Sequence, residues 1–298
     1  MRALWGWLMF LVAVSSIMAG GVFLAIALCA VSLLAGEEYI SMTRAKGMNP
    51  SPRIIRSMII AFFVLAAVPA IPGLNLSWDF SIEHFPVLLT VGVCTSFFRL
   101  LFRHENPPAT IADIATTVLG FIYVGWMPSH LVMLRTLIPP SMTELPLNPL
   151  QQPGLAYVWA TLFIVWATDV FAYVIGKRFG KTLLYPQVSP KKTVEGAIGG
   201  LVASIFFSCL VCYVADNYLF PSHPFQFRYW QAPFMGIVLS VGAQLGDLCE
   251  SLLKRDAGFK DSSALIPGHG GMLDRGDSLI VAAPIAYYWV CLVVLGIL

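Results

Sequence analysis

Residues 3–35 read ALWGWLMFLVAVSSIMAGGVFLAIALCAVSLLA, an apolar run without a charged residue. A helix needs about 20 mostly apolar residues to cross a bilayer, so the run is long enough for a tight hairpin of two helices. The small residues from Ser15 to Gly21 are the natural place for its turn. The run is too long for the apolar core of a signal peptide, which covers about 7–15 residues. We therefore expect it to stay in the membrane.

The rest of the chain repeats this character. Of its 298 residues, 58% are hydrophobic and 11% are charged, whereas a soluble domain carries about 25% charged residues. The sequence thus predicts an all-α, polytopic membrane protein of about nine transmembrane helices, within a range of eight to ten. The count is nine if the first run is split and eight if it is not. Pro128 is a candidate kink. The other apolar blocks are 54–74, 85–102, 109–137, 155–176, 194–220, 232–253 and 278–298.

The positive charges lie in alternate loops. Loops 36–56, 99–108, 177–193 and 254–277 hold 4, 2, 5 and 4 of the 18 lysines and arginines. Loops rich in Lys and Arg stay in the cytoplasm, so we expect these four loops and the N-terminus inside, and the C-terminus outside. The net charge of +2 gives no broad basic surface for nucleic acid.

A proline-rich segment, residues 138–154, is expected to be an external linker within one integral membrane domain, residues 1–298. It separates apolar spans in residues 1–137 from a more polar half, residues 155–298. The polar half holds the charged and polar side chains that could take part in catalysis, so we expect a catalytic cavity there, open to the cytoplasm.

The most polar stretch, residues 251–277, reads SLLKRDAGFKDSSALIPGHGGMLDRGD. Carboxylates hold hard cations such as Mg²⁺, and Lys, Arg and His neutralise phosphate oxygens. Asp274 and Asp277 are three residues apart, so they can reach one metal ion if this turn is helical. Asp247 would complete a site of three carboxylates. The alternative is a solvated loop whose charges only keep it in water.

Three carboxylates, Asp169, Asp247 and Glu250, fall inside apolar blocks. A charge facing lipid at mid-span costs about 2.5–3.5 kcal/mol on insertion scales, so these side chains are expected to face an interior polar cavity. For Glu250, a structural pair with Lys254 at i+4 is an equally good interpretation.

Two basic segments precede and open the block at 194–220. Residues 176–182, GKRFGKT, fall one residue short of a phosphate-binding P-loop and follow a membrane helix, so we reject that motif. Lys181, Lys191 and Lys192 are either cations beside a phosphate site or anchors at the membrane surface. The glycines of the G-x-x-x-G motif at 196–200 predict a close helix contact.

Three segments together resemble the phosphatidate cytidylyltransferase (CDP-diacylglycerol synthase) family: TDVFAYVIGKRFGK (168–181), SPKKTVEG (189–196) and residues 251–277. The N-terminal half matches only in character. One departure is Gly276, where the family has an apolar residue or Thr, which would loosen the turn between the two aspartates.

The resemblance implies transfer of cytidylyl from CTP to phosphatidate, giving CDP-diacylglycerol and pyrophosphate, with Mg²⁺ and a second cation. It also implies a homodimer, with residues 1–137 as scaffold and dimer contacts. The sequence shows no transit segment rich in Ser and Arg, so we expect a bacterial inner membrane. The expected metal ligands are Asp247, Asp274 and Asp277. The expected catalytic residues are Lys254, Arg255, Lys260, Asp261, His269 and Arg275. Substrate binding is assigned to Ser251, Lys181, Lys191, Lys192 and Asp169.

Two rival functions remain open at this point. A CTP-dependent lipid kinase would use similar residues but attack the γ-phosphorus. A secondary transporter would also place carboxylates inside the membrane, but the N-terminal spans and outer loops hold almost no charge, which leaves a path across the membrane poorly supported.

Overall fold

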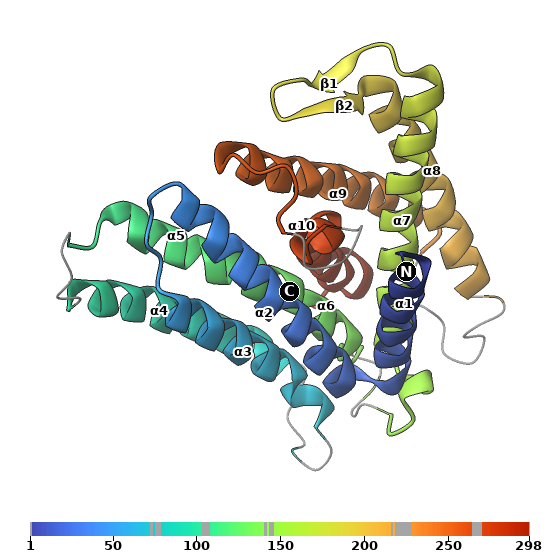
Figure 1. Ribbon diagram of the computed structural model, residues 1–298. Helices are drawn as coiled ribbons and strands as arrows, with labels where there is room; N and C mark the ends of the chain where they lie inside the picture. Colours follow the sequence, from blue (N-terminus) through green and yellow to red (C-terminus); the bar gives the residue numbers. More distant parts are fainter. Residues whose placement is uncertain are drawn as a thin grey trace.

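The computed structural model describes residues 2–71, 74, 79–102, 108–139, 142, 146–215, 217, 228–263 and 270–297, apart from the side chains of 2–5 and 79. These residues form ten α-helices and one two-stranded antiparallel sheet (Figure 1). The helices are α1 (Arg2–Ala19), α2 (Gly21–Ala45), α3 (Pro52–Ala67), α4 (Asp79–Leu101), α5 (Ile111–Phe121), α6 (Met127–Arg135), α7 (Gly154–Phe179), α8 (Val194–Val214), α9 (Gln231–Asp256) and α10 (Leu273–Trp289). The strands are β1 (Leu183–Tyr185) and β2 (Ser189–Thr193).

Eight helical segments in the described part of the chain are long and apolar enough to cross a membrane, and Gly6–Ala19 is a shorter apolar helix. The chain is therefore an all-α, multi-pass membrane protein, as predicted. The first apolar run is split, because α1 ends at Ala19 and α2 begins at Gly21. Between them Gly20 has φ of 115°, a conformation that glycine adopts readily and side chains disfavour.

The segment Ile111–Arg135 is interrupted close to the predicted kink. A π-helical turn, Ile122–Trp126, joins α5 to α6, and Pro128 follows in the first turn of α6. Proline has no N–H to bond the carbonyl one turn before it, so the regular hydrogen-bond pattern cannot continue there. The π-helical turn Ile122–Trp126, which is wider than an α-helical turn, accommodates this break in the hydrogen bonds.

Helices α7 and α8 lie side by side (Figure 1), and the glycines at 196 and 200 explain how closely. A Cβ atom at Gly196 would lie 2.6 Å from the carbonyl oxygen of Ala172, and one at Gly200 would lie 2.8 Å from that of Thr168. The predicted close helix contact is confirmed.

Helix α10 joins the two halves of the chain. It packs against α6 and α2 from the N-terminal half and against α9 and α7 from the C-terminal half. The linker is also anchored: the fully buried Arg135 donates to the carbonyl oxygens of Ile17 (3.0 Å) and Pro149 (2.8 Å) and to Oε1 of Gln152 (2.5 Å). The residues that carry the chemistry therefore sit on a continuous helical framework.

Candidate active site

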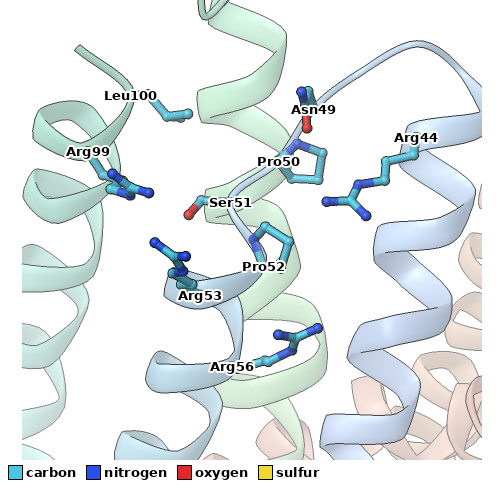
Figure 2. A pocket seen from close by; sticks show the side chains of 9 residues that line it. All are labelled: Arg44, Asn49, Pro50, Ser51, Pro52, Arg53, Arg56, Arg99 and Leu100. Carbon is cyan, nitrogen blue, oxygen red and sulfur yellow. The ribbon is translucent and has the colours of Figure 1, made fainter. Parts of the chain in front are cut away.

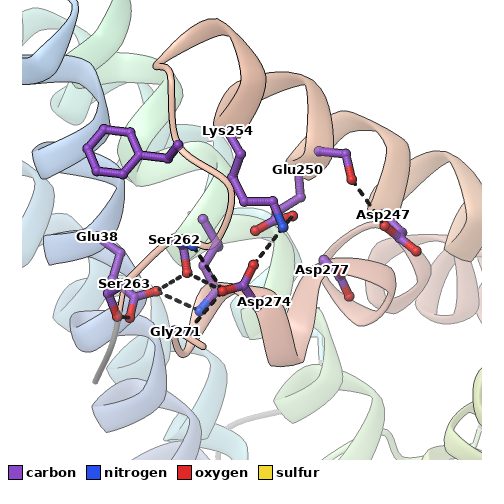
Figure 3. Close-up of polar contacts among 12 residues, drawn as sticks. Glu38, Asp247, Glu250, Lys254, Ser262, Ser263, Gly271, Asp274 and Asp277 are labelled. Carbon is purple, nitrogen blue, oxygen red and sulfur yellow. Dashed lines mark hydrogen bonds and ion pairs between the residues drawn. The ribbon is translucent and has the colours of Figure 1, made fainter. Parts of the chain in front are cut away.

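Both carboxylate oxygens of Asp274 are bound by neighbouring residues (Figure 3). The ammonium group of Lys254 lies 2.6 Å from its Oδ1. Its Oδ2 accepts hydrogen bonds from the N–H of Ser262 (2.9 Å), the hydroxyl of Ser262 (2.8 Å) and the N–H of Gly271 (2.8 Å). Lys254 also pairs with Glu250, so the predicted i, i+4 pair exists as part of a larger network. Asp274 thus fastens the segment after α9 to the start of α10.

Glu38 of α2 holds the same segment from the other side (Figure 3). Its carboxylate accepts from the hydroxyls of Ser262 (2.8 Å) and Ser263 (2.6 Å) and from the N–H groups of Met272 and Leu273 (both 2.8 Å). Met272 and Leu273 begin α10, where unsatisfied N–H groups and the helix dipole favour a negative charge. This buried carboxylate lies in α2, whereas the sequence predicts a loop there and no site residue at this position.

The two glycines of this segment are required by close approaches. Gly270 has φ of 80°. A Cβ atom at Gly271 would collide with the hydroxyl of Ser262 and the carboxylate of Glu38. Gly276, by contrast, lies within α10, and a Cβ atom there would meet nothing within 4 Å. The turn between Asp274 and Asp277 is therefore helical.

A second group of carboxylates lies one helical turn further along α10. Asp277 comes from α10, Asp247 from α9 and Asp169 from α7. Oδ1 of Asp277 accepts from the N–H of Ser278 (2.7 Å), and the Ser278 hydroxyl donates to Asp169 (3.3 Å). The charges of Asp247 and Asp169 both act on Asp277. We call Asp169, Asp247 and Asp277 the aspartate group.

Only one described cation pairs with this group: Lys192 of β2 lies 2.5 Å from Oδ2 of Asp247. The hydroxyl of Ser251 donates to the other oxygen, at 3.4 Å. Three carboxylates against one lysine leave an excess of negative charge, and such a group is costly without a further cation. Oxygen donors of this kind suit Mg²⁺.

The predicted metal ligands are divided between the two clusters. Asp247 and Asp277 belong to the aspartate group, whereas the oxygens of Asp274 are occupied by Lys254, Ser262 and Gly271. Within the described residues, no three His, Cys, Asp or Glu side chains are already arranged to hold a metal ion. The ligand set of Asp247, Asp274 and Asp277 stays a prediction. Asp169 accepts one described hydrogen bond, from Ser278, and is less engaged by the protein than Asp274.

The β1–β2 hairpin brings the basic segment to α9. Arg255 donates to the carbonyl oxygens of Val188 (3.4 Å) and Phe259 (3.0 Å), while Lys192 reaches Asp247. The N–H groups of Lys181 and Thr182 are bonded by the Glu195 carboxylate, so this turn does not present them to a phosphate. Thr193 caps α8, because its Oγ1 accepts from Gly196 N (3.2 Å).

The remaining predicted residues stand at the edge of the site or outside the described chain. The exposed ones are Lys181, Lys191, Lys260, Asp261 and Arg275. His269 lies outside the described residues. The structure therefore brings together Asp169, Lys192, Asp247, Ser251, Lys254, Asp274 and Asp277 on α7, β2, α9 and α10.

Comparison with known proteins supports one family. The sequence model of the cytidylyltransferase family matches residues 1–293. A phosphatidate cytidylyltransferase of Synechocystis sp. is 37% identical over 295 residues, which cover 94% of this chain and 92% of that protein. The protein of the same name from Bacillus subtilis is 31% identical over 240 residues, 76% of this chain and 80% of that one. Phosphatidate cytidylyltransferase 4 of Arabidopsis thaliana chloroplasts is 35% identical over 289 residues, 92% of this chain and 68% of that one. The chain belongs to the phosphatidate cytidylyltransferase family.

Proposed function

We propose that this protein transfers the cytidylyl group of CTP to phosphatidate and releases pyrophosphate, which makes CDP-diacylglycerol for phospholipid synthesis. The observation that carries the proposal is the relation to phosphatidate cytidylyltransferases along nearly the whole chain. The site supports it independently, because an aspartate group with too few cations lies beside lysines and an ordered glycine segment.

The reaction needs little from an acid or a base. A phosphate oxygen of phosphatidate attacks the α-phosphorus of CTP, a new P–O bond forms, and the bond to the β-phosphate oxygen breaks with its electron pair on pyrophosphate. The nucleophile is already an anion, so positioning and charge neutralisation supply most of the rate enhancement.

The excess of negative charge in the aspartate group supports a cation site there. We propose that Asp247 and Asp277, with Asp169, hold Mg²⁺ and that a second cation binds nearby. Bound cations neutralise charge on phosphate oxygens and on the leaving pyrophosphate. Asp274 then serves as a positioning residue that fixes the start of α10, since all of its described contacts are within the protein.

The basic residues also fall into two groups, those that hold the protein structure and those proposed to bind phosphate. Lys254 is engaged by two carboxylates, so its role is to position Asp274 rather than to bind phosphate. Lys192 is placed to contact a phosphate once a metal ion takes over the charge of Asp247. We assign the triphosphate and the lipid phosphate to the exposed cations Lys181, Lys191, Arg255, Lys260 and Arg275, and to His269, which lies outside the described residues.

We further propose that the active site faces the cytoplasm at the inner membrane of a bacterium and that the protein is a homodimer. The orientation follows from the lysines and arginines in alternate loops. Cysteine labelling of a loop residue from either side of sealed vesicles tests the orientation, and light scattering of the purified protein with its detergent contribution subtracted tests the dimer.

The decisive experiment uses purified protein in detergent with phosphatidate, CTP and Mg²⁺. Mass spectrometry follows the lipid product while pyrophosphate release is measured, for the wild type beside Asp277→Asn. CDP-lipid with pyrophosphate is the expected result. Free CDP with a phosphorylated lipid would instead show a kinase, and the absence of both products from folded protein would favour the transporter.

A further inference from the structure

We infer that a pocket lined by four arginines, built only from the N-terminal helices, binds the phosphate group of an anionic membrane lipid. The pocket has a volume of about 340 Å³ and lies between the ends of α2, α3 and α4 (Figure 2). Arg44 comes from the last turn of α2, Arg53 and Arg56 from the start of α3, and Arg99 from the last turn of α4.

The positive charge of this pocket is only partly compensated. Glu37 binds Arg56 through two hydrogen bonds, of 2.5 and 2.9 Å. Arg53 and Arg99 form no ion pair with any residue that the structure describes, and in Figure 2 their side chains lie near each other beside Ser51. Like charges brought together in this way repel one another, and a bound anion removes the repulsion.

The backbone between the arginines is held rigidly. The N–H of Asn49 donates to the carboxylate of Asp113 (2.5 Å), and the N–H of Ser51 donates to the hydroxyl of Thr117 (2.9 Å). Both acceptors belong to α5, so another helix fixes the floor of the pocket. Ser51 precedes α3 but makes no side-chain cap to it, which leaves the positive end of that helix facing the pocket.

The chemistry of the lining selects phosphate. A guanidinium group presents a planar fork of donors that matches phosphate oxygens, and a helix start adds backbone donors. A phosphate could belong to a lipid or to a soluble compound. The lipid is favoured because Phe98 and Leu101, on either side of Arg99, are 59% and 72% exposed and offer an apolar surface to acyl chains.

The test measures binding by the full-length protein in a neutral detergent, so it does not depend on the proposed function. Native mass spectrometry counts bound molecules during titration with phosphatidylglycerol and, separately, with phosphatidylcholine of the same chain length. The variant is Arg53→Gln with Arg99→Gln. Its matched control is Lys177→Gln with Arg178→Gln, which removes two exposed cations from the same predicted membrane face.

We expect the arginine variant to bind phosphatidylglycerol about tenfold more weakly or worse, because it loses two charge-assisted contacts, and the control to change less than about twofold. Equal weakening in both variants, or equal binding of phosphatidylcholine by the wild type, would overturn the inference. If inorganic phosphate at millimolar concentration displaces the lipid and binds with the same dependence on Arg53 and Arg99, the ligand is a soluble phosphate and the lipid assignment is wrong. If the double variant does not fold, Arg99→Gln alone is compared with Arg178→Gln.

Discussion

Asp274 and Asp277 lie one turn apart on α10, yet their surroundings are opposite. Asp274 is surrounded by donors: an ammonium group, a hydroxyl and two backbone N–H groups. Asp277 has the N–H of Ser278 and the repulsion of two other aspartates, which the charge of Lys254 offsets only in part. A carboxylate whose charge is satisfied inside the protein stabilises the structure, whereas one whose charge is left unsatisfied is available to a cation or a substrate. On this contrast we assign structural support to Asp274 and the proposed chemistry to Asp277.

The largest effect is expected at Asp277. Asp277→Asn removes a proposed metal ligand, so activity should fall by roughly 10²–10³-fold or more, as when a group that stabilises transition-state charge is removed. Because the change also relieves repulsion in the aspartate group, the unfolding temperature should stay equal or rise. Assays of CDP-lipid formation and a thermal unfolding curve check both parts. Asp256→Asn, at an exposed ion pair with Lys46, is the control and should change neither quantity.

Asp274→Asn should lower activity less and stability more. The change removes the ion pair between Asp274 and Lys254, which then keeps only Glu250 as a partner, and breaking a buried ion pair costs about 3–5 kcal/mol. We expect an unfolding temperature several degrees lower and residual activity that improves on cooling. A variant with normal stability and activity as low as that of Asp277→Asn would show that Asp274 is a metal ligand after all.

Glu38 and its sequence neighbour Glu37 provide a matched pair of variants, because only Glu38 contacts the start of α10. Glu38→Gln weakens four hydrogen bonds at the start of α10 and should lower both unfolding temperature and activity, the activity by about tenfold. Hydrogen bonds to charged groups contribute about 1.5–3 kcal/mol each. Glu37→Gln removes only an exposed pair with Arg56, worth less than about 1 kcal/mol. If the two variants behave alike in the unfolding and CDP-lipid assays, Glu38 does not support the site.

The smallest expected effect is a change in unfolding temperature on adding Mg²⁺, which compares Asp274 with Asp277 without an activity assay. Mg²⁺ that binds the folded state stabilises it by mass action, by about 2.7 kcal/mol at a concentration one hundred times the Kd. We expect Mg²⁺ to raise the unfolding temperature of the wild type and of Asp274→Asn by a few degrees, and to leave Asp277→Asn unchanged. A shift of equal size in all three proteins would place the cation elsewhere, and EDTA serves as the reference condition.

Much of the helical framework could be predicted from hydropathy, because the energy of a span depends on its own side chains. The block at 232–253 corresponds to Gln231–Asp256, and the break near Gly20 falls within the predicted turn. The end of α2 could not be placed in this way. Hydropathy places the end of the block at Ala35, but the backbone remains helical to Ala45, since charged residues do not interrupt a helix.

The site shows the same limit. Spacing alone indicates that Asp274 and Asp277 share one side of a helical turn, since side chains at i and i+3 do so in any helix. Their different roles depend on which residues return from elsewhere: Ser262, Lys254 and, through Glu38, a helix more than 200 positions earlier. The available signal for Glu38 was a pair of carboxylates that follows the apolar run after Gly36, with no further glycine until Gly47.

The bond between Glu38 and the start of α10 also sets when the enzyme can begin to work. Glu38 is synthesised early, and its partners Ser262 and Leu273 follow 224 and 235 residues later. At about 5–20 residues per second, the growing chain carries Glu38 for on the order of ten seconds or more before Leu273 is made. A chain halted after α9 therefore lacks the hydrogen bonds that join Glu38 to the start of α10, so the candidate site can be completed only once the last helix has been made.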